Sequence, residues 1–378
     1  MLERAVAALS QRVVAMIGLR PFTRELYHIF VDGWGASYVD VDRTLHSIRE
    51  LGNDGWARGW AATAQRYLWL AREAEAAGLR ASGSALYKRA SLYFRIADVA
   101  IDLDTPLKRA LYRQCVDAYA RFAALNEPPI DRLTFHRQAA SVAGYLHRPL
   151  GAGKAPCVII IPGLGSAKEQ PDFPPEVLTA RGIAAFPLDI PGHGEAFQET
   201  RLTAEAYQAV SDAFDVLAAH PAIDERRIAV LGTSLGGTVA LKAASEDDRF
   251  CAVVNISGFY EPRDWFEASA RFVEAALKYV TGIAGGPEVR ELVGTFTLRG
   301  AIGRIGCPLL TVHGGRDSLI PIEEARRIHA EAVCPNKLVT YPSGDHALCN
   351  TPEARFAILD WLAEQMAQTA SQPVSLAG

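Results

Sequence analysis

Residues 228–244, IAVLGTSLGGTVALKAA, decide the fold of this chain. They join the aliphatic run 228–231 to the helix-forming stretch 235–244 through the pentapeptide GTSLG at 232–236. In a sharp turn from strand to helix, glycines are needed because a Cβ would clash where backbone approaches backbone, and the central serine is left exposed at the strand end. The segment therefore predicts a strand–turn–helix elbow with Ser234 as a nucleophile.

A serine hydroxyl is a weak nucleophile, so it needs a general base and an acid that orients the base. In the α/β-hydrolase fold these follow the serine in the order acid, then histidine. Asp317 follows the apolar run 309–312, and His346 follows the run 338–341. The other histidines beyond the elbow are His313, at a strand end, and His329, inside an amphipathic stretch. We therefore expect Asp317 as the acid and His346 as the base; the alternative role for Asp317 is a cap of the helix at 322–332.

Backbone N–H groups stabilise the oxyanion in this fold. One is expected from Leu235, the residue after the nucleophile, and the other from the loop PGLG at 162–165, which follows the run 157–161. Within that loop Leu164 is the expected donor, with Gly165 as the alternative. His193 lies in the turn PGHGE before the elbow and is expected to brace the loop. Asp345, next to the expected base, is assigned no catalytic role.

The two parts of the chain differ in the spacing of their apolar residues. Residues 56–76, 81–101 and 104–125 place apolar groups at spacings of three and four, which predicts long amphipathic helices. After residue 130, short apolar runs alternate with helical stretches, which predicts a mainly parallel sheet flanked by helices. We expect an α/β-hydrolase catalytic domain at 131–369, a helical N-terminal domain at 1–130 and a disordered tail at 370–378. The expected strands lie at 141–147, 157–161, 183–188, 228–231, 252–256, 309–312 and 338–341.

Composition excludes several classes of protein. The net charge is -4, and no Lys/Arg run is present that would follow a phosphate backbone, so nucleic acid is not an expected partner. No stretch approaches the roughly 18 apolar residues of a membrane span, and charges interrupt the first apolar run, which predicts an amphipathic helix and not a signal peptide. The six cysteines are scattered without a CxxC pair, as expected for buried apolar residues in a reducing cytoplasm. No cluster has metal-ligand spacing, and we expect no metal or cofactor.

Three features together resemble one family: the loop PGLGSAKE (162–169), the turn PGHGEAF (191–197) and a helical N-terminal domain that contains SALYKRASLYFRIA (84–97). The strongest local matches are GTSLGGTVALKAA (232–244) and SGDHALCN (343–350). The combination resembles the family of 2,6-dihydroxypseudooxynicotine hydrolase, a carbon–carbon bond hydrolase, and is similar to fungal hydrolases that shorten polyketide chains. The resemblance implies a helical lid over the carboxyl edge of the sheet, a buried cavity for a small-molecule substrate, and a homodimer.

The resemblance also implies the reaction. Relatives with this layout cleave a bond next to a ketone through an acyl-enzyme, and a carbon leaving group needs an assisting proton donor. Residues 255–267, NISGFYEPRDWFE, resemble the cavity-lining segment of the family, where we expect substrate contacts from Glu267 and Trp265, and from Gly165 in the oxyanion loop. Glu261 and Asp264 are the other acids there, and a solvated acidic helix face is the plain alternative for all three.

Three other functions stay open at this point. The first alternative is a carboxylesterase of small or aromatic esters, which would need no extra proton donor. A peptidase of the prolyl-oligopeptidase type is less favoured, because the N-terminal part reads as helical where those enzymes carry a β-propeller. A non-catalytic binding protein is disfavoured by a serine, an aspartate and a histidine in the expected chain order.

Overall fold

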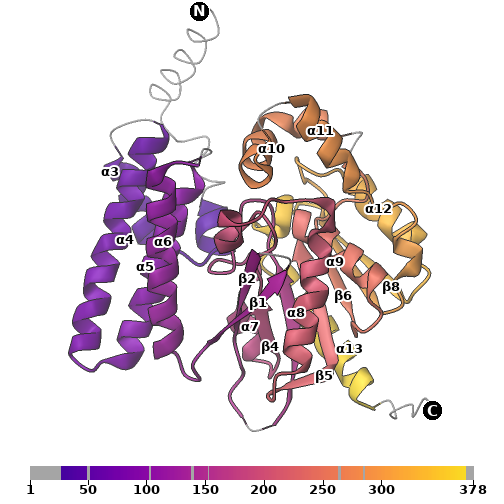
Figure 1. Cartoon of the computed structure of the whole chain (residues 1–378), viewed down its shortest axis with the longest axis horizontal. Helices are drawn as coiled ribbons and strands as arrows, with labels where there is room; N and C mark the ends of the chain where they lie inside the picture. The colour runs from indigo at the N-terminus through magenta and orange to yellow at the C-terminus, as the bar shows by residue number, and fades with distance from the viewer. Residues whose placement is uncertain are drawn as a thin grey trace, which may run out of the picture. The chain divides into compact units, whose positions relative to one another are not determined.

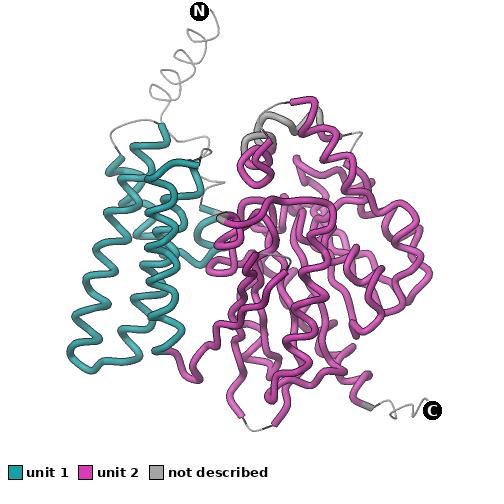
Figure 2. The backbone as a smooth tube through the Cα atoms, viewed as in Figure 1, with its two compact units in different colours: residues 1–125 teal, residues 126–378 magenta. Residues whose placement is uncertain are grey.

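The computed structural model describes residues 27–48, 52–101, 104–137, 140–151, 153–262, 265–283 and 286–371. The chain forms two compact units, residues 1–125 and 126–378 (Figure 2). The amphipathic helix expected within the first twenty residues and the end of the expected tail, 372–378, lie outside the described residues. Across the described segments, every helix is too short or too polar to cross a lipid bilayer.

All regular secondary structure in the described residues of unit 1 is helical. A π-helical turn, η1 (His28–Gly33), precedes α3 (Tyr38–Ser47), α4 (Asn53–Ala76), α5 (Arg80–Val99) and α6 (Pro106–Leu125) (Figure 1). Its core is aromatic: Trp60 and Tyr93 are fully buried, with ring centroids 5.7 Å apart. The hydroxyl of Tyr93 donates to Asp40 Oδ2 at 2.8 Å, and that of Tyr67 donates to the same oxygen at 2.5 Å. The three long helices predicted from apolar spacing are confirmed.

Unit 2 is built on a six-stranded parallel sheet in the order β4-β3-β5-β6-β7-β8. Its strands are β3 (Ala155–Ile161), β4 (Ala184–Pro187), β5 (Ile223–Thr233), β6 (Val253–Ile256), β7 (Leu309–Gly314) and β8 (Asn336–Tyr341). β1 (Asp131–Arg137) and β2 (Ala140–Leu146) form a separate antiparallel pair. Two backbone hydrogen bonds of 2.9 and 3.0 Å between His147 and Ala185 tie the end of β2 to β4. The α/β-hydrolase fold is confirmed, and β1 is an element that the sequence did not predict.

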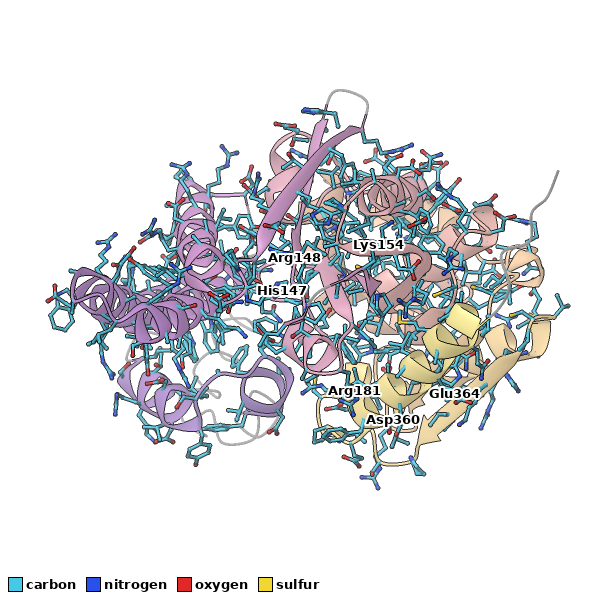
Figure 3. All side chains as sticks on the ribbon, turned by 90° about the horizontal axis from the view of Figure 1, so that it is seen from below. His147, Arg148, Lys154, Arg181, Asp360 and Glu364 are labelled. Carbon is cyan, nitrogen blue, oxygen red and sulfur yellow. The ribbon has the colours of Figure 1, made fainter. Side chains whose placement is uncertain are left out.

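Side chains of the sheet alternate between two apolar layers. On one face, Ile159 and Val230 pack with α8 (Gln208–Ala218) and α9 (Leu235–Glu246). On the other, Val158 and Leu231 pack with α7 (Pro175–Thr179) and α13 (Ala354–Ser371). Burial on both faces explains why these strands read as continuous apolar runs and not as alternating patterns. In Figure 3, Asp360 of α13 lies beside Arg181, and the two charged groups are 3.2 Å apart.

An insertion between β6 and β7 carries two further helices, α10 (Phe266–Thr281) and α11 (Gly286–Thr295). After it, α12 (Ile322–Glu331) connects β7 to β8. In parallel sheets of this kind, ligands bind in the crevice outside the carboxyl ends of the strands. The insertion begins at that edge, next to the elbow at the end of β5.

Candidate active site

The serine elbow is held in a strained backbone conformation. Ser234 has φ 56° and ψ -123°, outside the regions that L-residues ordinarily occupy. Its N–H donates to Ile256 O at 2.8 Å, which pins the turn to β6. A Cβ on Gly232 would lie 2.0 Å from Gly236 O, and one on Gly236 would lie 2.3 Å from Ile161 O. Both glycines are therefore required by close backbone approach, as the GTSLG pattern predicted.

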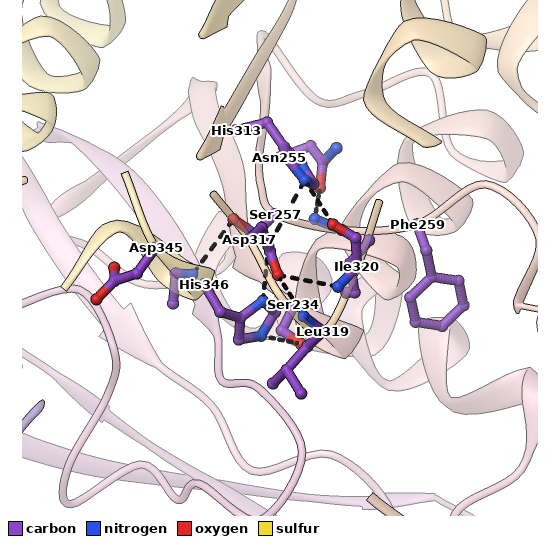
Figure 4. Close-up of polar contacts among 12 residues, drawn as sticks. Ser234, Asn255, Ser257, Phe259, His313, Asp317, Leu319, Ile320, Asp345 and His346 are labelled. Carbon is purple, nitrogen blue, oxygen red and sulfur yellow. Dashed lines mark hydrogen bonds and ion pairs between the residues drawn. The ribbon is translucent and has the colours of Figure 1, made fainter. Parts of the chain in front are cut away.

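The structure brings the three predicted polar residues together (Figure 4). His346 Nε2 lies 3.0 Å from Ser234 Oγ, and His346 Nδ1 lies 2.8 Å from Asp317 Oδ2. An ionised carboxylate only accepts hydrogen bonds, so Nδ1 carries the ring proton and Nε2 is free to accept one from the serine hydroxyl. Ser234 ends β5, Asp317 follows β7 and His346 follows β8, so three strand ends supply the three side chains.

Asp317 is held as a buried anion. Its side chain is only 1% exposed. Burial by itself would raise the pKa of Asp317, but the hydrogen bond from His346 and those from the N–H groups of Leu319 and Ile320, both 2.9 Å, outweigh it and lower the pKa below its ordinary value. The two backbone donors meet Oδ1, which leaves Oδ2 for the histidine.

A second histidine lies behind this aspartate. His313 is fully buried, with Nε2 3.0 Å from Ile320 O and 3.5 Å from Asp317 Oδ2. Because a carbonyl faces Nε2, that nitrogen carries the proton, and Nδ1 has no hydrogen-bond partner within the described residues. Burial lowers the pKa of His313, so the ring stays neutral. His313 therefore packs behind the acid and does not compete with His346 for the serine.

The two predicted N–H donors of an oxyanion hole belong to Leu235, which follows Ser234, and Leu164, which lies in the loop after β3. Leu235 opens α9, where the first N–H groups of a helix have no acceptor within it. Leu164 occupies the second position of a turn that Ser166 N–H closes onto Gly163 O at 3.1 Å. Neither N–H finds an acceptor among the described residues. Gly165, the third residue of the turn, has φ +80°. A positive φ at this position is typical of a type II turn and favours glycine.

An apolar cavity of about 230 Å³ opens at Ser234, and all residues that line it belong to unit 2. Leu164 and Trp265 line it, whereas Gly165 does not. Trp265 packs edge-on against Phe259 at 5.5 Å. Nine of the twenty lining residues come from the insertion: Phe259, Pro262, Trp265, Phe266, Val273, Ala276, Leu277, Val293 and Phe296. A cavity of this size and character suits a small apolar molecule.

The sequence profile of the family described as esterase FrsA-like matches residues 40–261. The chain belongs to the FrsA-like family of α/β-hydrolases. A second profile, that of the prolyl oligopeptidase family, matches residues 171–369, which contain the elbow and both of its polar partners.

Individual proteins that are similar to this FrsA-like hydrolase are also hydrolases, which agrees with the family assignment. It is 28% identical over 331 residues to 2,6-dihydropseudooxynicotine hydrolase of Paenarthrobacter nicotinovorans, a match that takes in 87% of this chain and 88% of the relative. The crystal structure of 2,6-dihydroxy-pseudo-oxynicotine hydrolase superimposes with a TM-score of 0.83 at 27% identity, covering 90% of this chain and 95% of the other. A 20-hydroxy-prefusarin hydrolase of Gibberella moniliformis is 28% identical over 62% of this chain, a match that spans 58% of the fungal protein. The predicted family resemblance is confirmed.

The acids predicted near the cavity lie in different places. Glu261 does not line the cavity; its Oε2 accepts a hydrogen bond from Arg299 at 2.7 Å. Asp264 lies outside the described residues. Glu267 is in the first turn of α10, but its side chain is not among those that the structure describes. Asp345 points away from the serine, and its Oδ1 accepts the N–H of Asn350 at 3.2 Å (Figure 4).

Sequence reasoning missed one carboxylate in this FrsA-like site. Asp172 lines the cavity, and its Oδ2 accepts the N–H of Gly163 at 2.7 Å. Its Oδ1 accepts the hydroxyl of Ser166 at 3.1 Å. The only available signal was its position, three residues after the PGLGSAKE loop at the carboxyl edge of the sheet, which does not separate it from an ordinary loop aspartate.

A buried ion cluster, which the sequence did not predict, anchors Lys168 of the same loop. The fully buried ammonium of Lys168 contacts carboxylate oxygens of Glu169, Asp189 and Glu195 at 2.6, 2.9 and 2.7 Å. Burial would lower the pKa of Lys168, but these carboxylates raise it well above its ordinary value. Gly194 must lack a side chain here because a Cβ would lie 2.1 Å from Asp189 Oδ2. His193 is buried in the same turn, with Nδ1 3.3 Å from Pro191 O, which is consistent with the predicted bracing role.

The described residues contain no group of three or more His, Cys, Asp or Glu side chains that could hold a metal ion. All six cysteines are free. The prediction that all six are buried is wrong for Cys251, Cys307 and Cys349, which are half-buried. These three lie at element ends, where the chain reaches the surface. Burial nevertheless raises the pKa of Cys251 and Cys307 to about 12, so both remain protonated thiols.

Proposed function

We propose that this FrsA-like hydrolase uses Ser234, His346 and Asp317 as a catalytic triad to cleave the carbon–carbon bond next to a ketone in an aryl-ketone or polyketide-like substrate. The observation that carries the proposal is the 3.0 Å contact of His346 Nε2 with Ser234 Oγ, made at the wall of an apolar cavity. The likeness to the pseudooxynicotine hydrolase, which extends over both units, supports the substrate class.

In the proposed reaction the Ser234 oxygen attacks the ketone carbon while His346 takes the hydroxyl proton. The carbonyl oxygen becomes an oxyanion facing the N–H groups of Leu235 and Leu164. When the tetrahedral intermediate collapses, the carbon–carbon bond breaks, its electron pair stays on the departing carbon, and His346 protonates that carbon. Water, activated by His346, then releases the acyl group as a carboxylic acid and restores the serine.

Carbon is a poor leaving group, so the proposal includes an assisting acid. We assign this role to Glu267, at the start of the helix whose residues Phe266 and Val273 line the cavity. An acid at this point would polarise a keto or hydroxyl group of the leaving part and so stabilise the developing carbanion. Trp265 would provide an apolar contact for the substrate.

The second candidate is a carboxylesterase of small or aromatic esters, which the family description as an esterase favours. An ester oxygen leaves without assistance, so the triad and the two N–H donors would suffice. A peptidase is less favoured, although the prolyl oligopeptidase profile matches, because the regular secondary structure described in unit 1 is all helical, where those enzymes carry a β-propeller.

Covalent labelling tests whether Ser234 is the nucleophile. A fluorophosphonate should label the wild-type protein and leave Ser234→Ala unlabelled, with turnover reduced by about 10⁶ because a triad acts as a unit. Failure of the wild type to react would favour a non-catalytic binding protein.

A pair of substrates then separates the two reactions. Glu267→Gln should slow hydrolysis of an aryl ketone by about 10² or more, the usual contribution of general acid–base assistance, and leave an activated aryl ester near the wild-type rate. Product masses identify which bond breaks. Equal losses on both substrates would indicate a structural role for Glu267, and no loss on either would favour the esterase.

A further inference from the structure

Asp172 is set apart from the other acids of the chain by its surroundings. Of the residues that line the cavity in the described part of the chain, it alone carries a carboxyl group. A negative charge beside the position where an oxyanion develops opposes the proposed chemistry, so its presence calls for a compensating role. The two hydrogen bonds that it accepts indicate that role.

Both of these bonds join Asp172 to the turn that carries Leu164. One carboxylate oxygen holds the N–H of Gly163, the first residue of the turn, at 2.7 Å, and the other holds the hydroxyl of Ser166, the last, at 3.1 Å. The turn's own bond, from Ser166 N–H to Gly163 O, measures 3.1 Å. Asp172 therefore bridges both ends of a four-residue turn whose second residue presents an N–H that has no acceptor among the described residues.

The turn also lies against the nucleophile. A Cβ on Gly163 would be 3.3 Å from Thr233 O and 3.5 Å from Ser234 Cβ. At this range, a displacement of the turn by about 1 Å changes the distance from the Leu164 N–H to the reacting carbonyl oxygen enough to lose most of its stabilising effect.

Asp172 is not placed as a proton donor. Its Oδ2 accepts the N–H of Gly163, which can only donate, and its Oδ1 accepts the hydroxyl of Ser166. An ionised carboxylate satisfies both donors at once, whereas a proton on the carboxyl group would displace the Gly163 bond or reverse the bond to Ser166. The arrangement suits a group that holds the loop and not one that supplies a proton to the leaving group.

We propose that Asp172 is a positioning residue that fixes the turn of Gly163 to Ser166, so that the Leu164 N–H points at the oxyanion of the acyl-transfer transition state. This inference rests on the proposed function. It assigns to Asp172 an effect on the transition state and none on the binding of the ground-state substrate.

The test compares Asp172→Ala with Asp172→Asn on an activated aryl ester. Asp172→Ala should lower kcat by about 10², the contribution of one oxyanion donor, with KM nearly unchanged. Asp172→Asn should recover to within about tenfold, because its amide oxygen can accept the Gly163 N–H while its NH₂ group donates to the Ser166 oxygen. Glu176→Ala, an exposed acid in the same part of the chain, is the matched control and should leave kcat unaltered.

Inhibition separates a transition-state effect from a general structural one. An aryl boronic acid forms a tetrahedral adduct whose oxygen occupies the oxyanion position, so its affinity for Asp172→Ala should fall in parallel with kcat/KM. The affinity of the product carboxylic acid should stay within about twofold. Equal weakening of both ligands, or unchanged boronic acid affinity, would overturn the inference.

Should Asp172→Ala fail to fold, Ser166→Ala provides the second variant. It removes one of the two hydrogen bonds, and kcat should fall several-fold with boronic acid affinity falling alongside. Full activity in Ser166→Ala together with full activity in Asp172→Asn would contradict the bridge. Fluorophosphonate labelling of the wild type separates the two proposals. An unlabelled wild-type protein would refute Ser234 as the nucleophile. If the wild type is labelled but Asp172→Ala changes neither kcat nor boronic acid affinity, only the inference about Asp172 is refuted.

Discussion

Replacement of Asp317 by asparagine tests how the acid determines the state of the histidine. In the structure Asp317 Oδ1 accepts two backbone N–H groups, from Leu319 and Ile320. An asparagine keeps those bonds only if its amide oxygen takes the Oδ1 position, which directs its NH₂ group at His346 Nδ1. That nitrogen must then accept, so the ring proton moves to Nε2, the atom 3.0 Å from Ser234 Oγ. A protonated Nε2 cannot take the serine proton.

The magnitude follows from this tautomer. An intact site with the wrong histidine tautomer loses about 10⁴ in kcat, equivalent to roughly 5.4 kcal/mol of transition-state stabilisation. The assay is steady-state hydrolysis of an activated aryl ester, with boronic acid binding as a check that the cavity is intact. Asp345→Asn is the matched control, because it neutralises the acid next to His346 that pairs with Asn350 instead. A loss of less than tenfold for Asp317→Asn, or a larger loss for Asp264→Asn, would refute the reasoning.

The same variant has a stability signature with a defined sign. Because the pKa of Asp317 is lowered in the folded state, its ionisation stabilises the fold at pH values above the ordinary aspartate pKa of about 3.9. This stabilisation is lost as the pH falls through the lower, folded-state pKa. The difference in unfolding free energy between wild type and Asp317→Asn should therefore be largest near neutral pH and shrink in acid, as measured by urea denaturation. A difference that grows in acid would contradict the assigned direction.

Two further predictions concern the buried ion cluster and unit 1. Lys168→Met removes a fully buried cation that contacts Asp189 at 2.9 Å, and should lower the free energy of unfolding in urea by about 3–5 kcal/mol. Lys154→Met breaks an exposed pair of 3.0 Å with Glu225 and should change that free energy little. Equal effects of the two variants would contradict a stabilising role for the cluster. A truncated protein that starts at residue 126 should lose turnover of the native substrate, because the likeness to the pseudooxynicotine hydrolase includes unit 1. A soluble truncated protein with the wild-type kcat/KM would disprove the prediction that unit 1 is a lid.

Local patterns predicted the elements of unit 2 that are buried on both faces. Each apolar run became a strand, and β5 leads into the elbow as expected because the glycines of GTSLG permit only a tight turn. β1 was missed because strands were expected at continuous apolar runs, whereas DRLTFHR carries apolar side chains only at every second position, as in a strand with one exposed face, and pairs only with β2. The proximity of Ser234, Asp317 and His346 followed from chain order, since the strands that precede them end at one edge of the sheet.

The cavity could not be predicted in the same way. The helical pattern of α10 shows that one side is apolar, but only its docking over the strand ends decides that Val273 and Leu277 line a cavity. The partners of Asp172 and Lys168 are likewise set by how loops meet. Lys168 and Asp189 are 21 residues apart in the chain, and neither has a local pattern that marks it as buried.

The arrangement of acids restricts how a carbon leaving group could be protonated. Asp172 lines the cavity but is hydrogen-bonded to the turn of Gly163 to Ser166, and Glu261, which does not line the cavity, is paired with Arg299. Among the side chains that the structure describes, His346 is then the group placed to return a proton near Ser234. If Glu267 contributes nothing, carbon–carbon cleavage would have to proceed on that single proton, so the substrate would need its own keto or hydroxyl group to stabilise the carbanion. Ketone turnover by Glu267→Gln therefore distinguishes assistance by the enzyme from assistance by the substrate, even where the carbon–carbon bond is the one that breaks.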